Sequence, residues 1–246
     1  MLLHLYPKAC LIIVLFIYSF TLQAQVIRVA AASSMVDLLH EIKVEFEKTH
    51  HQTIEIISGS SGTLTNQILQ GAPFDLFFSA NIKYTDILKS KGMGIYPPEI
   101  FTYSPIVIWT KEAIGSPATY MLSESCQSIG IAQPGLAPFG DMALRYLQTI
   151  THESVSHKLV YGSNIAITNQ YIYAGSVDLA ITSKSSQVKL SRAIPCCWTE
   201  VSNSIVPKLP HAFLVLQPNA LPLYEYLQEE KNTSRSFENH GYSSSP

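Results

Sequence analysis

The sequence predicts an α/β fold of two lobes, each a mainly parallel sheet flanked by helices. Short apolar segments of strand length alternate with segments whose apolar residues recur every three or four positions, as in amphipathic helices. Strands that alternate with helices favour a parallel sheet covered on both faces. The alternation restarts after Ser104 and Pro105, so the 246 residues are expected to form two similar lobes rather than one core.

The first lobe is predicted from three strands, each followed by a helix. The strands are expected at 25–32, 53–58 and 74–79, and the helices at about 35–46, 64–69 and 82–91. Ser34 and Asp37, three positions apart, have the form of a capping box. The first helix is therefore expected to begin at Ser33 and Ser34.

The second lobe repeats this arrangement. Strands are predicted at 106–110, 128–132, 158–161 and 177–182. One helix is expected through Met142, Tyr146 and Ile150, and another at 165–173, directly after the turn Gly162-Ser163-Asn164.

The amino-terminal residues have the pattern of a cleaved export signal. Lys8 precedes the apolar run ACLIIVLFIYSF, and the small residue Ala24 suits a cleavage site. The run is shorter than the roughly 20 residues that a membrane span needs, although a retained anchor is the alternative. We expect residues 1–24 to be a signal peptide and the mature protein to be exported.

Charge and cysteine content limit the classes of partner. The chain has 16 basic and 18 acidic residues, a balance that argues against nucleic acid, which requires clustered positive charge. Outside the predicted signal lie Cys126, Cys196 and Cys197. A disulfide from Cys126 to one of the adjacent pair is permitted, but their spacing favours neither a disulfide scaffold nor a metal site. We expect no cofactor.

Four predicted helices begin at a turn of Ser, Gly, Asn or Pro at the end of a strand. Ligands of open α/β sheets bind at the carboxyl ends of the strands, and helix starts offer unpaired N–H groups with a partial positive charge. Each turn alone is typical of an ordinary helix cap. The segment ISGSSGTL has neither the GK[ST] ending of a phosphate-binding loop nor the GxSxG of a hydrolase. Together, the four turns predict an anion held by dipoles and hydroxyl groups.

Six segments, in the same order, resemble those of periplasmic molybdate-binding proteins. They are VAAASSM, SGSSGTL, GAPFDLFFSA, IAQPGLAPFGDMAL, VYGSNIA and the terminal HGYSSSP. The resemblance implies a type II periplasmic binding fold, with two lobes joined by crossing strands near 102–108 and 204–209. Lobe I would comprise 25–105 and the returning segment 207–246, and lobe II would comprise 106–206.

The resemblance also implies the ligand contacts. Ser33, Ser34 and Ser61 would donate through hydroxyl groups, with Ser33 and Ser61 also using their N–H groups, and Phe139 and Ile165 would donate through the main chain. Thr182 stands where one branch of the family has a tyrosine that gives the fifth contact, so either Thr182 substitutes for it or the site uses fewer side-chain donors. Molybdenum would be present as the bound oxyanion, without direct protein ligands.

The chemistry of molybdate agrees with such a site. Molybdate is a dianion without protons at neutral pH, so a site of donors suits it, whereas protonated phosphate prefers an acceptor. Asp141 lies near the expected contacts; we interpret it as a first-turn acid that points away from the ion. Sulfate is also a proton-free dianion, and we expect cavity size to select against it, because each unpaired buried donor costs about 1–3 kcal/mol.

The predicted function is therefore that of a monomeric periplasmic binding protein, not an enzyme. It would capture molybdate, and tungstate of nearly the same size, and deliver it to an inner-membrane ABC permease. A binding protein for sulfate, phosphate or an organic acid is the nearest alternative. An exported hydrolase is a more distant one, because no motif places His40, His152 or His211 beside a nucleophile.

Overall fold

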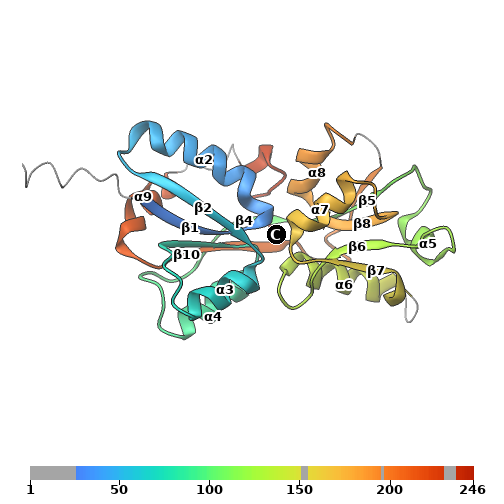
Figure 1. The fold of residues 1–246 in the computed structure, drawn as a ribbon, viewed down its shortest axis with the longest axis horizontal. Helices are drawn as coiled ribbons and strands as arrows, with labels where there is room; N and C mark the ends of the chain where they lie inside the picture. The colour runs from blue at the N-terminus through green and yellow to red at the C-terminus, as the bar shows by residue number, and fades with distance from the viewer. Residues whose placement is uncertain (1–25, 151–154, 195–196, 230–236) are drawn as a thin grey trace, which may run out of the picture.

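The computed structural model describes residues 26–150, 155–194, 197–229 and 237–246, and it contains two five-stranded sheets (Figure 1). The predicted signal peptide at 1–24 and Cys196 lie outside these ranges. Within them, no helix is long and apolar enough to cross a bilayer.

The first sheet has the strand order β2-β1-β3-β10-β4. These strands are β1 (Val26–Ala32), β2 (Thr53–Gly59), β3 (Leu76–Ser79), β4 (Glu99–Ser104) and β10 (Leu209–Val215). The associated helices are α2 (Val36–Thr49), α3 (Ser61–Leu69), α4 (Ile82–Ser90) and α9 (Leu221–Gln228), with the short 3-10 helices η1 (Ser33–Met35) and η3 (Pro218–Ala220).

The second sheet has the order β7-β6-β8-β5-β9. Its strands are β5 (Ile106–Thr110), β6 (Ile129–Ala132), β7 (Leu159–Gly162), β8 (Leu179–Ser183) and β9 (Trp198–Glu200). Its helices are α5 (Pro117–Leu122), α6 (Pro138–Ile150), α7 (Ile165–Tyr173) and α8 (Lys184–Leu190), with the 3-10 helix η2 (Ser156–Lys158).

The two sheets are built on one plan. Three strands in each are parallel, with β1 between β2 and β3, and β6 between β7 and β8. An antiparallel strand follows on one side, β10 beside β3 and β5 beside β8. The predicted α/β class is confirmed, and the late strand β10 pairs within the first sheet. The boundaries predicted at 105/106 and 206/207 fall between β4 and β5 and between β9 and β10.

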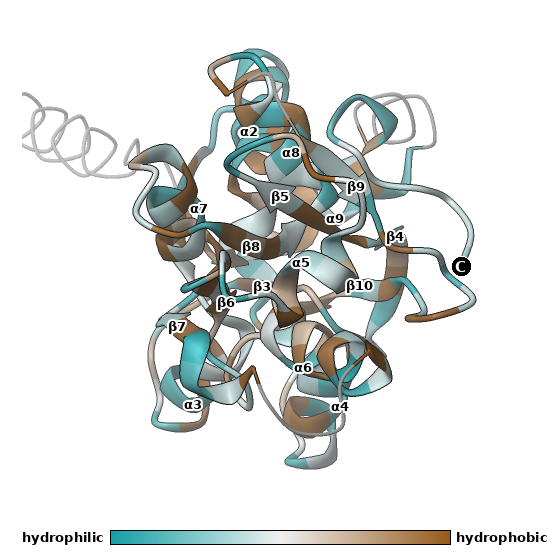
Figure 2. Ribbon diagram, turned by 90° about the vertical axis from the view of Figure 1, so that its right-hand side faces the viewer, coloured by the Kyte–Doolittle hydropathy of each residue, from teal (hydrophilic) through white to brown (hydrophobic). Residues whose placement is uncertain are grey.

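The cores lie where the apolar faces of helices meet the sheets. Leu38, Leu39, Ile42 and Phe46 form the buried stripe of α2, at the predicted spacing. Burial of one such side chain contributes about 1.5–3 kcal/mol. All five residues of β5 are buried, as expected for a strand covered on both faces. In Figure 2 the strands β5 and β8 are largely brown, whereas α7 and α8 mix brown and teal.

One local expectation was wrong, and the structure answers the question of a bridge from Cys126, which the sequence left open. The capping box is not formed, because the chain first makes the 3-10 turn η1 and α2 then starts without a side-chain cap. Cys126 is a free, buried thiol, so the bridge from Cys126 to the adjacent pair is absent. Cys197 is disulfide-bonded. Burial raises the pKa of the Cys126 thiol, which sits among apolar side chains.

Candidate functional site

A small cavity lies where strand ends of both sheets meet. It has a volume of about 10 Å³, close to the space of one water molecule. The cavity is lined by residues that follow β1, β2 and β3 in the first lobe and β6 and β7 in the second. Its lining residues are Ala32, Ser33, Ser34, Gly59, Ser60, Ser61, Ala80, Ala137, Pro138, Phe139, Asn164 and Ile165.

Four helix starts converge on this cavity, as the sequence predicted. They belong to η1, α3, α6 and α7, whose first residues all line it. The Ser60 hydroxyl caps α3 by accepting the Thr63 N–H, and the Asn164 side chain caps α7 by accepting the Ile167 N–H. The first N–H groups of a helix have no partner within it, so the cavity wall is rich in donors.

Besides the capping Ser60, the three predicted serines add hydroxyl groups to this wall. The Ser34 residue is 8% exposed, and its hydroxyl has no hydrogen-bond partner among the described residues. A buried hydroxyl without a partner costs free energy unless a ligand or water satisfies it. The Ser61 hydroxyl oxygen accepts the Ala80 N–H at 3.1 Å, which leaves its proton for another acceptor. Ser33 lines both this cavity and a neighbouring groove.

Phe139 and Ile165 lie in the first turns of α6 and α7. Their side chains are buried in the hydrophobic core, at 1% and 3% exposure, and both residues line the cavity. Five of the six predicted residues are therefore brought together.

Thr182 is not brought to this cavity. It is fully buried in β8, where its hydroxyl donates to Asn169 Oδ1 at 2.9 Å and lies 3.2 Å from Ser186 Oγ. The threonine hydroxyl is thus satisfied inside the second lobe and does not reach the cavity.

The cavity wall carries no charge among its described lining residues. Asp141, the nearest acid in the sequence, accepts the Gly135 N–H at 2.7 Å and lines a different groove. A carboxylate at the wall would repel an anion, so its engagement elsewhere keeps the site favourable for negative charge. Within the described ranges, no cluster of three His, Cys, Asp or Glu side chains is arranged to hold a metal ion.

Hydrogen bonds join the two lobes around the cavity. The Gly62 N–H of α3 donates to the Leu136 carbonyl at 2.8 Å, and the Tyr84 hydroxyl donates to the Gly135 carbonyl at 3.1 Å. Burial raises the pKa of Tyr84 to about 12, with a smaller effect from the charge of Asp141, so this hydroxyl stays protonated. These two hydrogen bonds connect the lobes, so they can form together when the lobes are closed.

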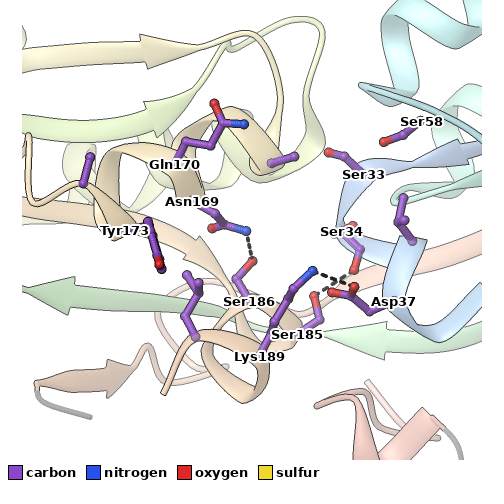
Figure 3. A pocket seen from close by; sticks show the side chains of 14 residues that line it. Ser33, Ser34, Asp37, Ser58, Asn169, Gln170, Tyr173, Ser185, Ser186 and Lys189 are labelled. Atoms are coloured by element: carbon purple, nitrogen blue, oxygen red, sulfur yellow. Dashed lines mark hydrogen bonds and ion pairs between the residues drawn. The ribbon is translucent and has the colours of Figure 1, made fainter. Parts of the chain in front are cut away.

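A larger groove of about 530 Å³ opens beside the cavity (Figure 3). The Lys189 and Asp37 side chains meet across it at 2.7 Å, one from each lobe. Sequence reasoning missed the polar residues that the second lobe contributes, namely Asn169, Ser185 and Ser186. The available signal was the hydroxyl-rich SKSS, which directly follows the apolar strand 177–182.

His211 lies in a buried aromatic cluster, in ring contact with Phe139 and Tyr242. Its Nδ1 lies 3.0 Å from the Leu209 carbonyl, so Nδ1 carries the proton, and Nε2 has no described partner. Burial lowers the pKa of His211 to about 4. A serine nucleophile requires a hydrogen bond to a base such as histidine. The His211 ring has no hydrogen bond to a serine among the described residues.

Comparison with known proteins agrees with this architecture. Residues 27–242 match the family of bacterial extracellular solute-binding proteins. The chain is 27% identical over 222 residues to the molybdate-binding protein ModA of Azotobacter vinelandii, covering 86% of this chain and 87% of that protein. It is 29% identical over 223 residues to the putative ABC transporter substrate-binding lipoprotein YvgL of Bacillus subtilis, covering 87% and 85%.

The fold is also that of a solved relative. The structure of the Azotobacter vinelandii periplasmic molybdate-binding protein superposes with a TM-score of 0.81 at 18% identity, covering 89% of this chain and 100% of that one. The family match spans nearly the whole described chain, and the cavity lies between the two lobes, a position at which ligand pockets commonly occur. The chain is a bacterial extracellular solute-binding protein.

Proposed function

We propose that this protein captures molybdate in the cavity between its lobes and delivers it to an inner-membrane ABC permease. It would act in the periplasm as a monomer, after export through the signal at 1–24 and without a cofactor. The observation that carries the proposal is the uncharged cavity formed by four helix starts, whose lining residue Ser34 has a buried hydroxyl without a partner among the described residues. The names of two relatives, one molybdate-binding and one from an ABC transporter, point the same way.

The proposed contacts are all donors. Ser33, Ser34 and Ser61 supply hydroxyl protons, and the N–H groups of Phe139 and Ile165 complete the set. Hydrogen bonds from oriented donors to a charged oxygen are stronger than neutral ones. Donors without net charge can thus replace the hydration shell of a dianion, aided by the helix dipoles. The metal atom would be enclosed by its own oxygen atoms and would touch no protein ligand.

Such a site distinguishes anions by protonation and by size. The proton of protonated phosphate would find no acceptor in a wall of donors. Each buried group left without a hydrogen bond costs about 1–3 kcal/mol of binding free energy. Sulfate has no proton but is smaller, so it would leave donors unpaired in a cavity that molybdate fills.

Closure follows from the position of the donors. Ser34 and Ser61 belong to the first lobe, whereas Phe139 and Ile165 belong to the second, so the ion stabilises the closed arrangement by touching both. The bond between Gly62 and Leu136 then adds to the closed state.

Isothermal titration of the mature protein with molybdate, tungstate, sulfate and phosphate tests the proposal. We expect tight binding of molybdate and tungstate, and much weaker binding of sulfate and phosphate. Ser33→Ala and Ser61→Ala should weaken molybdate binding, whereas Ser90→Ala, an exposed position on α4, serves as the matched control. Tight binding of sulfate or phosphate without molybdate would refute the assignment, as would unchanged affinity in both serine variants.

A further inference from the structure

We propose that Tyr242 is a positioning residue for the oxyanion site, because its hydroxyl holds the carbonyl oxygen of Ser34 away from the ligand cavity. This inference rests on the proposed function. Tyr242 belongs to the carboxyl-terminal segment and lies 208 positions after Ser34 in the sequence.

The contact is short and buried. The Tyr242 hydroxyl donates to the Ser34 carbonyl oxygen at 2.7 Å, and the Tyr242 residue is 5% exposed. The Ser185 hydroxyl of α8 donates to the same oxygen at 3.0 Å (Figure 3). Neither Tyr242 nor Ser185 lines the small cavity, so the oxygen is directed at groups outside it. Burial raises the pKa of Tyr242, and the hydroxyl therefore keeps its proton as a donor.

The carboxyl-terminal segment is anchored on both sides of Tyr242. Ser243 exchanges two backbone hydrogen bonds with Tyr103 on β4, at 2.8 and 2.9 Å. Gly241 packs so closely on the start of α8 that an added Cβ would lie 3.0 Å from the Lys184 carbonyl oxygen, and its φ of +79° favours glycine. The Tyr242 ring packs edge-on against His211, at 5.2 Å between centroids. These contacts fix the hydroxyl at the junction of the lobes, where Figure 1 places the chain end.

The charge of the ligand gives this contact a function. Ser34 offers an unpartnered hydroxyl and lines the cavity, but the same residue carries a carbonyl oxygen with partial negative charge. A carbonyl turned toward a dianion would repel it, and two hydroxyl donors on the oxygen oppose that rotation. One donor comes from the carboxyl-terminal segment and the other from the second lobe, so the second bond depends on closure.

The test is a set of molybdate titrations with the complete mature chain. Tyr242→Phe removes the hydroxyl and keeps the ring. We expect a loss of affinity of about 2- to 12-fold, which corresponds to one neutral hydrogen bond. Ser185→Ala should act similarly, and Ser185→Thr, which retains the hydroxyl, should restore affinity. Because the two donors share one oxygen, the double variant should lose more than the product of the single effects.

Matched controls separate positioning from general stability. Tyr224→Phe removes a tyrosine hydroxyl that donates to Glu99 at 2.8 Å, outside the cavity lining, and should leave affinity unchanged. Thermal unfolding without ligand shows whether each variant folds. Unchanged molybdate affinity in Tyr242→Phe, or a double variant equal to the product of the singles, would overturn the inference alone. A wild-type chain that binds no molybdate would refute the proposed function and this inference with it.

Discussion

Gly62→Ala should weaken molybdate binding by blocking closure. An added Cβ would lie 2.8 Å from the Leu136 carbonyl oxygen and 2.9 Å from its Cα, which is closer than real Cβ contacts allow. These atoms are backbone of the opposite lobe, so they can move away only if the lobes separate. The substitution also strains or breaks the 2.8 Å bond from the Gly62 N–H to that carbonyl.

The size of the effect follows from these two contributions. Loss of a backbone hydrogen bond costs about 1 kcal/mol, and overpacking of a close contact costs about 1–3 kcal/mol. The closed state should thus lose about 2–4 kcal/mol, equivalent to about 30- to 700-fold in molybdate affinity. With the lobes apart the overlap is absent, and alanine favours the helix α3 by up to about 1 kcal/mol over glycine. The ligand-free variant should therefore unfold at the same temperature as the wild type or higher.

Isothermal titration and thermal unfolding of the same sample separate these effects. Gly115→Ala is the matched control, because an added Cβ there meets nothing within 4 Å. Molybdate affinity within a factor of three of wild type in Gly62→Ala would show that the overlap does not oppose closure, and the reasoning would be wrong.

Three further predictions concern the serine, the ion pair and the buried histidine. Ser34→Ala should weaken molybdate binding about 10- to 100-fold, which corresponds to the loss of one hydrogen bond to a charged group. The unfolding temperature without ligand should stay equal or rise, because a buried hydroxyl without a partner among the described residues is removed. Titration measures the affinity and calorimetry the unfolding temperature, and a lower unfolding temperature would contradict the assignment. Lys189→Ala breaks the interlobe ion pair with Asp37; the two side chains are 61% and 43% exposed, so molybdate affinity should fall by less than about 5-fold, and by less still at high salt. Lys48→Ala, whose ion pair lies within α2, is the control. A loss of affinity that persists at high salt would argue against a screened ion pair as its cause. His211 has a pKa of about 4 when folded against 6.5 when unfolded, so the unfolded state binds more protons between these values and the free energy of unfolding should fall by about 3 kcal/mol as pH drops from 6.5 to 4. In denaturant unfolding, His211→Phe should lack this part of the dependence of the unfolding free energy on pH. The same pH dependence in the variant and the wild type would exclude the histidine as its cause.

The elements with strong local signals were predicted well from the sequence. The helix expected at 165–173 matches α7, because the turn before it and the glycine after it both mark its ends. The strand expected at 106–110 matches β5, a continuous apolar run between breakers. Short elements such as β9 and α5 were missed, since three to six residues carry too little periodicity to be recognised.

The candidate site was predictable to the extent that it is built from turns. Ser33, Ser61 and Ile165 stand within three positions of a strand end, so their place at the sheet edge follows from the α/β plan. Ser34 was assigned to a capping box, but the 3-10 turn η1 leaves its hydroxyl without a partner. A local motif cannot reveal this, because the turn is also held by Tyr242, a residue from the other end of the chain.

The contact of Tyr242 and the inward position of Thr182 share one physical cause. Both depend on side-chain packing in the folded chain, across 208 positions for Tyr242 and across 13 and 4 positions for Thr182, and neither leaves a periodic or compositional signal. Thr182 finds Asn169 and Ser186 within its own lobe, so its hydroxyl is satisfied before the lobe interface is reached.

A crystal structure of the mature protein grown with molybdate tests the central claim most directly. We predict the ion between the lobes, with its oxygen atoms accepting hydrogen bonds from the hydroxyl groups of Ser33, Ser34 and Ser61 and from the N–H groups of Phe139 and Ile165. Molybdate bound by a lysine or arginine side chain, or lodged in the groove beside Lys189 instead of the cavity, would contradict the account.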